Sequence, residues 1–430
     1  MIEKLPELVN ADAALIHRGR WVSTTVLVGV GDRHYLLTIE KGRLSQVREG
    51  PFVTPSYDFG VTAPAEEWER FWAPRPLPGS HDLFALLRRG VLTLSGDLHP
   101  FMANLQYFKD VLAAPRAMPS RAAAAPPSRA AAAPPVGAAA APTATFEPIV
   151  GRYLRVELLG RPHRVYVEEA GSGVPLLCLH TAGADTRQYR GLLNDPWVLE
   201  RFRVISFDLP WHGKTSPPAG WQGGDYRLTR DDYERITLGM CDALRLDCPV
   251  VMGCSIGGRL VLDLALSHPE RFRALIGLQA GASVPPYYDA SWLDRPDVDG
   301  GRVSAAVVSG LVGPDAPREH RWETLWHYLQ SGPGVFRGDL FFYNHDAAGD
   351  LSARLAGRDA DGPACALYLL TGEYDYSCSP DDTLAAAASL PGSEVTIIPG
   401  MGHFPMSEDP DRFHAHLRPV LERILTGQPE

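Results

Sequence analysis

An alanine- and proline-rich segment divides this chain and prevents it from folding as one continuous domain. From Pro115 to about Thr145 the sequence is almost entirely Ala and Pro, and it contains the run Ser-Arg-Ala-Ala-Ala-Ala-Pro-Pro twice. The segment has no aromatic side chain to bury, and its prolines interrupt any helix that the alanines could start. We therefore predict a linker over residues 113–145, which joins a domain over 1–112 to a larger one over 146–430.

The larger segment alternates short apolar runs with amphipathic stretches. The apolar runs are Pro175–Leu179, Arg203–Phe207, Pro249–Met252, Ala274–Leu278, Ala366–Leu370 and Glu394–Ile398. Continuous apolar runs of this length are typical of parallel strands that are buried on both faces. Amphipathic stretches at Leu228–Leu244, with Thr229 as a suitable N-cap, and at Leu260–Ser267 predict covering helices. The pattern predicts an α/β fold with a mostly parallel, doubly wound sheet, and the alternating segments Tyr153–Leu159 and His163–Glu169 predict an antiparallel edge.

A glycine-flanked serine follows the third of these apolar runs. The sequence Gly253-Cys254-Ser255-Ile256-Gly257 has the G-x-S-x-G pattern and lies between a predicted strand and a predicted helix. Such a turn exposes a serine hydroxyl and points the helix N-terminus at the reacting centre. Glycine is required on both sides because larger side chains would collide with neighbouring elements. The pattern alone occurs often by chance, but its place between strand and helix predicts Ser255 as a nucleophile.

A serine nucleophile needs a base, and the base needs a carboxylate that fixes its tautomer. Both follow Ser255 in the order that this architecture requires. Asp375 comes after one predicted strand and His403 after the next, so both are expected at the same sheet edge. Glu373 is a rival for the acid because it lies only two residues before Asp375.

An oxyanion hole requires two backbone N–H groups that point at the reacting oxygen. We expect one from Ile256, directly after the serine. The other is expected from the loop His180-Thr181-Ala182-Gly183, where Ala182 is favoured and Thr181 is the alternative. His180 is expected to brace this loop rather than to transfer protons.

Taken together, these motifs resemble the α/β-hydrolase superfamily over residues 150–428. The matching sequences are His180-Thr-Ala-Gly183, Asp208-Leu-Pro-Trp-His-Gly213, Gly253-Cys-Ser-Ile-Gly-Gly258, Gly372-Glu-Tyr-Asp375 and Gly402-His403. The resemblance implies a serine hydrolase of the esterase kind, in which Ser255 forms an acyl-enzyme. Members of the family that attack through a carboxylate have Asp at this position, so their chemistry is disfavoured. The chain departs from the family at Thr181 and Trp211, where glycine is common.

Residues 281–360 exceed what the sheet needs and are expected to form a cap over the site. Ten aromatic residues occur between residues 282 and 350, an excess over the 9% of the whole chain. Such an excess is typical of the roof of an apolar pocket. We therefore expect a small apolar or aromatic ester as substrate. The residues expected to contact it are Thr181, Trp211, Trp292 and Trp326.

Two other functions are compatible with the sequence. The pair Gly257-Gly258 also occurs in hydrolases that cleave C–C bonds of ring-cleavage products, so this chemistry is the first alternative. The second alternative is a catalytically weak protein in which residues 1–112 carry a lipid. The presence of Ser255, Asp375 and His403 argues against the second.

Residues 1–112 predict a small α+β domain. The expected strands, which form an antiparallel meander, are Trp21–Val30, His34–Glu40 and Leu44–Arg48. The expected helices are Ala65–Trp72, His81–Arg89 and Pro100–Leu112. The segment from Gly90 to Leu98, followed by a helix, resembles the end of sterol-carrier-protein domains, which enclose a lipid-binding tunnel. The resemblance implies a lipid-binding module, and the alternative is a scaffold for homo-oligomers.

Composition excludes several other classes of function. The net charge of −10 argues against a nucleic-acid partner, because little would neutralise phosphates. The sequence has no apolar run long enough to span a membrane and no signal-peptide pattern, so a cytoplasmic protein is expected. The six cysteines lack zinc-binding spacing and are expected to be free thiols. Neither a metal nor a cofactor is expected.

Overall fold

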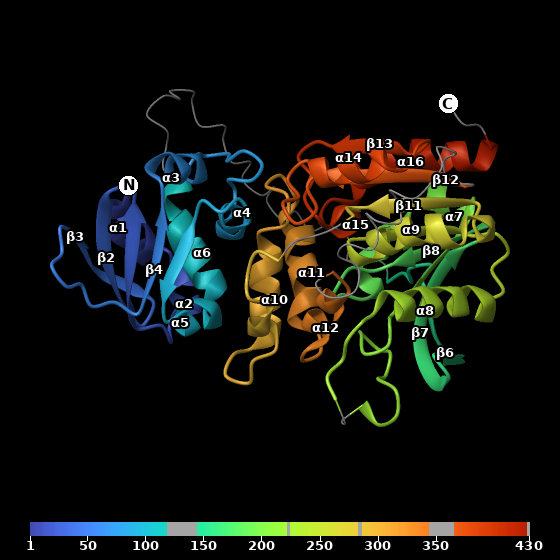
Figure 1. Cartoon of the computed structure of the whole chain (residues 1–430), viewed down its shortest axis with the longest axis horizontal. Helices are drawn as coiled ribbons and strands as arrows, with labels where there is room; N and C mark the ends of the chain where they lie inside the picture. Colours follow the sequence, from blue (N-terminus) through green and yellow to red (C-terminus); the bar gives the residue numbers. More distant parts are fainter. Residues whose placement is uncertain (118–143, 222–223, 283–285, 344–364, 428–430) are drawn as a thin grey trace.

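The computed structural model describes residues 1–117, 144–221, 224–282, 286–343 and 365–427. Most of the predicted linker and part of the predicted cap lie outside these ranges. Within the described residues, no helix is both long and apolar enough to cross a membrane. Figure 1 shows the N-terminal domain at one end, the large sheet at the other, and helices α10, α11 and α12 between them.

The N-terminal domain is a five-stranded sheet of order β3-β2-β1-β4-β5 with helices packed against it. Its strands are β1 (Thr24–Val30), β2 (Arg33–Glu40), β3 (Arg43–Glu49), β4 (Phe59–Ala63) and β5 (Thr93–Gly96). Its helices are α1 (Leu5–Ala11), α2 (Ala13–Arg18), α3 (Ala65–Phe71), α4 (Leu83–Arg88), α5 (His99–Ala103) and α6 (Leu105–Ala113). The predicted meander of β1, β2 and β3 is confirmed, since both pairings are antiparallel.

Strand β4 was not predicted, and it pairs parallel with β1. It includes Gly60 and follows a segment with two prolines, Pro51 and Pro55, which favour a loop over a strand. The aromatic rings of this domain make its core. Phe59 packs against Phe101 at 5.3 Å and Phe108 at 5.0 Å between ring centroids, and the indole N–H of Trp68 donates to the Gly29 carbonyl at 2.7 Å.

The larger domain contains an eight-stranded sheet of order β13-β12-β11-β10-β8-β9-β7-β6. Its strands are β6 (Val150–Leu158), β7 (Arg161–Gly171), β8 (Val174–Leu179), β9 (Phe202–Phe207), β10 (Val250–Cys254), β11 (Ala274–Leu278), β12 (Ala366–Gly372) and β13 (Glu394–Ile398). The strands from β13 to β9 are parallel, and β7 and β6 form an antiparallel edge. The predicted fold class is confirmed.

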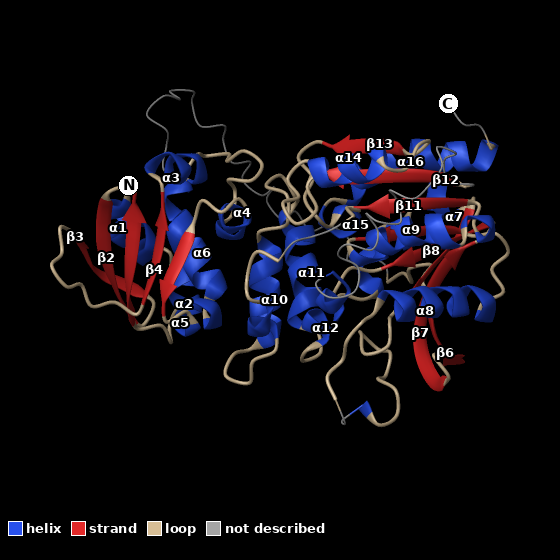
Figure 2. Cartoon of the chain, in the orientation of Figure 1, coloured by secondary structure: helices blue, strands red, loops and turns tan. Residues whose placement is uncertain are grey.

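Helices cover both faces of this sheet (Figure 2). They are α7 (Pro196–Leu199), α8 (Arg230–Ala243), α9 (Ile256–Ser267), α14 (Pro380–Ala388), α15 (Pro405–Glu408) and α16 (Pro410–Thr426). Successive strand residues point to opposite faces, so Leu176 packs in one hydrophobic layer with α16, and Leu177 packs in the other with α9. The hydroxyl of Thr229 caps α8 by accepting from the Asp232 N–H, as predicted.

The cap lies between β11 and β12, and three of its helices lie within the described residues. They are α10 (Gly300–Ser309), α11 (Arg318–Leu329) and α12 (Val335–Phe341). One hydrophobic core runs without interruption from the N-terminal domain through the cap into the α9 side of the sheet. The cap is therefore packed from both sides.

Candidate active site

The predicted nucleophile Ser255 lies at the turn between β10 and α9. Its backbone has φ 60° and ψ −113°, a strained conformation for a residue with a side chain. Neighbouring backbone explains the two glycines that flank the turn. A Cβ on Gly253 would lie 2.3 Å from the Gly257 carbonyl oxygen, and one on Gly257 would lie 2.9 Å from the Leu179 carbonyl oxygen. The local sequence therefore permits the close approach of strand and helix that the turn requires.

His403 and Asp375 are brought together from two loops at the carboxyl ends of β13 and β12. The Nδ1 atom of His403 lies 2.6 Å from Oδ2 of Asp375, and both side chains are buried. The other carboxylate oxygen of Asp375 accepts from the N–H groups of Ser377 and Cys378. The rival carboxylate of Glu373 instead accepts from a backbone N–H. Asp375 is therefore the carboxylate that contacts His403, and it can fix the tautomer of the imidazole.

The loop that carries His403 is held by a buried carboxylate on α15. Both oxygens of Glu408 accept backbone N–H groups, from Gly402 and Gly313 on one oxygen and from Phe404 on the other. Burial raises the pKa of Glu408 to about 7, although these three amides oppose the rise. The backbone N–H of His403 itself donates to the Leu311 carbonyl at 2.8 Å. The position of the imidazole thus depends on α15 and on the segment after α10.

Glu408→Gln is expected to lower the free energy of unfolding by about 1–3 kcal/mol. A carboxamide must turn its NH2 group toward at least one of the three N–H donors, which leaves that donor unpaired. Chemical denaturation at pH 8 measures the loss, and Glu422→Gln on the exposed face of α16 is the matched control. Equal stability of the two variants would show that the amides do not depend on the carboxylate.

The predicted oxyanion loop lies directly after β8. Its Thr181 N–H donates to the side chain of Gln188 at 3.0 Å, and its Gly183 N–H donates to Asp339 at 2.7 Å. Because the N–H groups of Thr181 and Gly183 already donate to side chains, Ala182 is favoured over Thr181 as the oxyanion donor from this loop. Ile256, the other predicted donor, is the first residue of α9.

His180 has the contacts that a bracing residue requires. Its Nδ1 lies 2.9 Å from the Thr181 carbonyl, and its Nε2 accepts from the Leu209 N–H at 3.1 Å. Burial lowers the pKa of His180 to about 4, so the ring is neutral at pH 7. The hydroxyl of Thr181, where the family commonly has glycine, lies 2.5 Å from the hydroxyl of Tyr328 on α11. This departure from the family therefore ties the oxyanion loop to the cap.

Asp339 of α12 makes the second tie between the cap and this loop. The side chain is fully buried and accepts from the Gly183 N–H, from Nε2 of His212 at 2.7 Å and from the hydroxyl of Tyr226 at 2.8 Å. Burial disfavours the charged form of His212, but the Asp339 carboxylate more than offsets this and raises the pKa of His212. Asp339 was not predicted, because nothing in the local sequence of α12 distinguishes it from a surface aspartate.

Ser255 and His403 line one pocket beneath the cap. The pocket has a volume of about 60 Å³, room for only about two water molecules. Apolar side chains dominate its walls, among them Tyr287, Tyr288, Val307, Val308, Leu311, Phe336, Leu340 and Tyr343. Tyr343 and Ser255 both line this pocket. Aromatic rings of the cap therefore fill the space next to the predicted nucleophile.

The four predicted substrate contacts lie in different places. Thr181 lines the pocket together with Ala182. Trp292 is buried but faces His99 of the N-terminal domain, at 6.3 Å between ring centroids. Trp326 is 54% exposed on the outer face of α11. The structure thus brings Thr181 to Ser255 and leaves these two tryptophans away from it.

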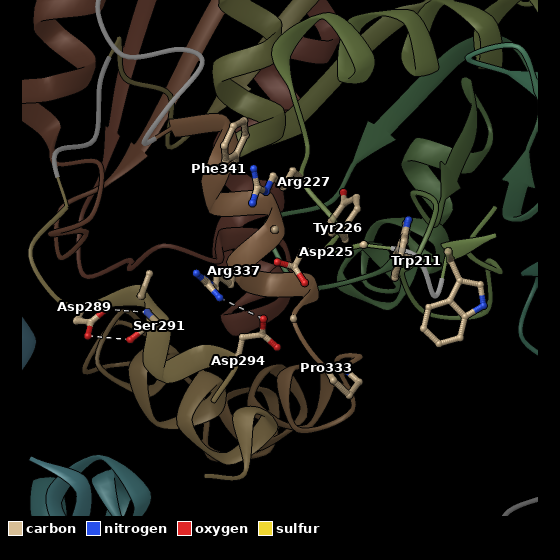
Figure 3. Close-up of a pocket in the computed structure, with 15 residues that line it drawn as sticks. Trp211, Asp225, Tyr226, Arg227, Asp289, Ser291, Asp294, Pro333, Arg337 and Phe341 are labelled. Atoms are coloured by element: carbon tan, nitrogen blue, oxygen red, sulfur yellow. Dashed lines mark hydrogen bonds and ion pairs between the residues drawn. The ribbon is translucent and has the colours of Figure 1, made fainter. Parts of the chain in front are cut away.

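Trp211 lines a second, larger pocket on the other face of α12 (Figure 3). This pocket has a volume of about 650 Å³, and its side chains include Arg227, Arg337 and Asp294. The backbone of Trp211 has φ 81°, which explains why glycine is common at this position. Its ring packs against Tyr226 at 5.3 Å between centroids. We assign the reaction to the smaller pocket because Ser255 and His403 line that one.

The chain belongs to the alpha/beta hydrolase fold family, whose model matches residues 174–410. A thermophilic esterase from Thermogutta terrifontis has the same fold. The two structures superpose with a TM-score of 0.54 at 20% identity, over 64% of this chain and 99% of the esterase.

Curated relatives point to hydrolytic chemistry. A 2-hydroxymuconate semialdehyde hydrolase from Pseudomonas sp. (strain CF600) is 32% identical over 153 residues, which is 35% of this chain and about half (51%) of that protein. A pimeloyl-[acyl-carrier protein] methyl ester esterase from Nitrosospira multiformis is 26% identical over 273 residues, 59% of this chain and 96% of that protein. These matches indicate that the chain is a hydrolase.

Proposed function

We propose that this hydrolase cleaves carboxylic esters through an acyl-enzyme on Ser255. The observation that carries the proposal is the buried contact between His403 and Asp375 beside a pocket that Ser255 also lines. A strained serine at the start of α9 and a base with a fixed carboxylate are the parts that acyl transfer needs. Neither a metal nor a cofactor is required for this chemistry.

The proposed reaction has two halves. In the first, His403 takes the proton of the Ser255 hydroxyl while the oxygen attacks the ester carbonyl. The N–H groups of Ile256 and Ala182 stabilise the resulting oxyanion. The tetrahedral intermediate collapses, its C–O bond to the alcohol breaks, and the protonated imidazole gives its proton to the departing alkoxide. In the second half, His403 activates a water molecule that attacks the acyl-enzyme and releases the acid and Ser255.

The pocket walls support an apolar acyl or alcohol group as substrate. The cap supplies most of the apolar surface: Val307 and Val308 from α10, Leu311 from the segment after it, and Phe336 and Leu340 from α12. A volume of about 60 Å³ is too small for an aryl ester. We therefore expect side chains such as Tyr343 to move before such a substrate binds.

Cleavage of a C–C bond is the second candidate reaction, and the relative from strain CF600 favours it. The same residues would serve, because Ser255 could attack one ketone carbon of a 1,5-diketone. The adjacent C–C bond would then break, and the leaving carbon would depart as an enolate stabilised through conjugation with the second ketone and take a proton from His403. A panel of p-nitrophenyl esters with acyl chains of two to twelve carbons, run beside a vinylogous 1,5-diketone, separates the two. Higher kcat/KM for the esters supports the proposal, and higher kcat/KM for the diketone overturns it.

The panel also tests the proposed substrate class. We expect kcat/KM to rise from acetate to a medium-chain or aromatic acyl group, because each buried methylene contributes about 0.8 kcal/mol of favourable transfer free energy. A preference for short, polar esters would contradict an apolar pocket.

Lipid binding by residues 1–112 stays a separate proposal, which the recovery of lipid from the purified full chain would test.

A further inference from the structure

Helix α10 lies between the pocket and the N-terminal domain and contacts both. One face carries Val307 and Val308, which line the pocket with Ser255, and Leu311 just after the helix lines it too. The opposite side is covered by the N-terminal domain, where α10 lies next to α6 (Figure 1). Phe84 of that domain packs against Tyr288, another pocket residue, at 5.4 Å between ring centroids. The N-terminal domain thus supports the wall of the candidate active site.

A buried lysine of the N-terminal domain binds the end of α10. Lys109 donates to the Ala306 carbonyl at 2.7 Å and to the Ser309 hydroxyl at 3.2 Å, and it forms an ion pair with Asp82 at 2.7 Å. Its three N–H donors therefore all have partners, although the side chain is only 5% exposed. A cation at this end of a helix is favourable, because the last carbonyl groups carry partial negative charge.

The two residues before Leu83 bind the same end of α10. Nε2 of His81 lies 3.0 Å from the Gly310 carbonyl, and a Cβ added to Gly310 would lie 2.2 Å from the Asp82 side chain. Glycine at 310 therefore permits the close contact between the two domains. Burial lowers the pKa of His81 to about 4, so its neutral form donates to Gly310 at pH 7.

These contacts lead directly to the proposed base and acid. The carbonyl of Leu311, the residue after Gly310, accepts a hydrogen bond from the backbone N–H of His403. Asp82 also reaches the other catalytic loop, where the hydroxyl of Tyr376 donates to it at 3.4 Å. Tyr376 follows Asp375 directly in the chain. One cluster of the N-terminal domain therefore contacts both segments that hold the His403–Asp375 pair.

We propose that the N-terminal domain is a fixed positioning part of the active site. His81, Asp82 and Lys109 hold the end of α10 and the Tyr376 loop, and through them they set the position of His403 against Asp375. The proposal rests on the proposed function, since it assigns a positioning role to residues that touch no substrate. It also gives residues 1–112 a role in catalysis that does not require them to detach or to carry a ligand.

Substitution of His81 in the full chain tests the proposal. His81→Leu removes the donor to Gly310, and we expect the rate of Ser255 labelling by a fluorophosphonate probe to fall about tenfold to a hundredfold at 25 °C. His81→Gln keeps a donor near the same place, so it should restore most of the rate. The acid limb of the pH profile of kcat/KM should shift in His81→Leu, because the contact between His403 and Asp375 is altered.

The double variant Asp82→Asn/Lys109→Met keeps the test valid if His81→Leu fails to fold. It removes the ion pair without leaving a single buried charge. The control is Arg33→Met, which breaks ion pairs with Glu3 and Glu49 inside the N-terminal domain. A labelling rate and pH profile like those of the unmodified chain in folded His81→Leu, or in the folded double variant, would overturn the proposal. Absence of labelling in the unmodified chain would instead overturn the proposed function.

Discussion

Ser255→Ala should reduce kcat for ester hydrolysis by about 10⁴- to 10⁶-fold while the protein remains folded. The remaining groups can bind an ester and polarise its carbonyl, but no oxygen is left to form the acyl-enzyme. The loss should appear in kcat rather than in KM, because the hydroxyl is a small part of the pocket wall. Steady-state kinetics with a p-nitrophenyl ester measure it, and fluorophosphonate labelling should disappear.

Ser267→Ala is the matched control, because Ser267 ends the same helix α9 and its hydroxyl bonds to Glu234 and to a carbonyl of its own helix. We expect this variant to keep full activity and to label normally. Thermal unfolding of both variants should resemble that of the unmodified chain. Ser255→Ala with full activity would eliminate Ser255 as nucleophile and would move the search to the larger pocket beyond α12.

Asp339→Ala is expected to destabilise the protein by about 3 kcal/mol or more. The side chain is fully buried, and its removal leaves the Gly183 N–H, the His212 ring and the Tyr226 hydroxyl without their acceptor. We also expect kcat/KM to fall at least about tenfold, because the oxyanion loop loses its tie to α12. Urea denaturation and ester hydrolysis at 20 °C measure the two effects. Unchanged kcat/KM would show that the loop is positioned without the cap.

Asp339→Asn separates the charge of this group from its hydrogen bonds. The pKa of His212 is raised above its ordinary value in the folded protein by Asp339, so the charged pair contributes stability that is fully present below pH 6.5. This contribution is lost as pH rises through the folded pKa of His212. The difference in unfolding free energy between the unmodified chain and Asp339→Asn should therefore shrink as pH rises. A difference that grows with pH would contradict a charged His212–Asp339 pair.

The central strands were predictable because burial on both faces leaves little choice of residue. The bounds of β11 and β13 match their apolar runs to the residue, since each run is flanked by polar or turn-forming residues. The candidate triad was predictable because the chemistry of acyl transfer fixes the residue types, and the fold fixes their order. Asp375 could be separated from Glu373 only by the structure, because two residues in one loop point in different directions.

The cap contacts could not be predicted from aromatic content. Trp322 and Trp326 are four residues apart, so they share the outer face of α11, where they are 48% and 54% exposed. Leu325 and Tyr328 occupy the inner face. The sequence of this short helix is apolar or aromatic on both sides, so it does not reveal which side faces the pocket.

Contacts between segments that are far apart in the sequence could not be predicted either. The hydrogen bond from Gly183 to Asp339 joins residues 156 positions apart, and the contact of His81 with Gly310 joins residues 229 positions apart. Neither contact is indicated by a motif that contains both partners, because only Gly183 belongs to one. Such contacts depend on how the cap and the N-terminal domain pack, which local sequence does not specify.

The hydroxyl of Thr181 has a kinetic consequence. It joins the oxyanion loop to Tyr328, so one of the contacts that hold this loop is present only while α11 covers the site. A pocket of about 60 Å³ must open to admit substrate, and opening releases this hold. Enclosure of the substrate must then precede attack in every turnover. For good leaving groups the rate should become independent of the leaving group and follow the closing motion instead.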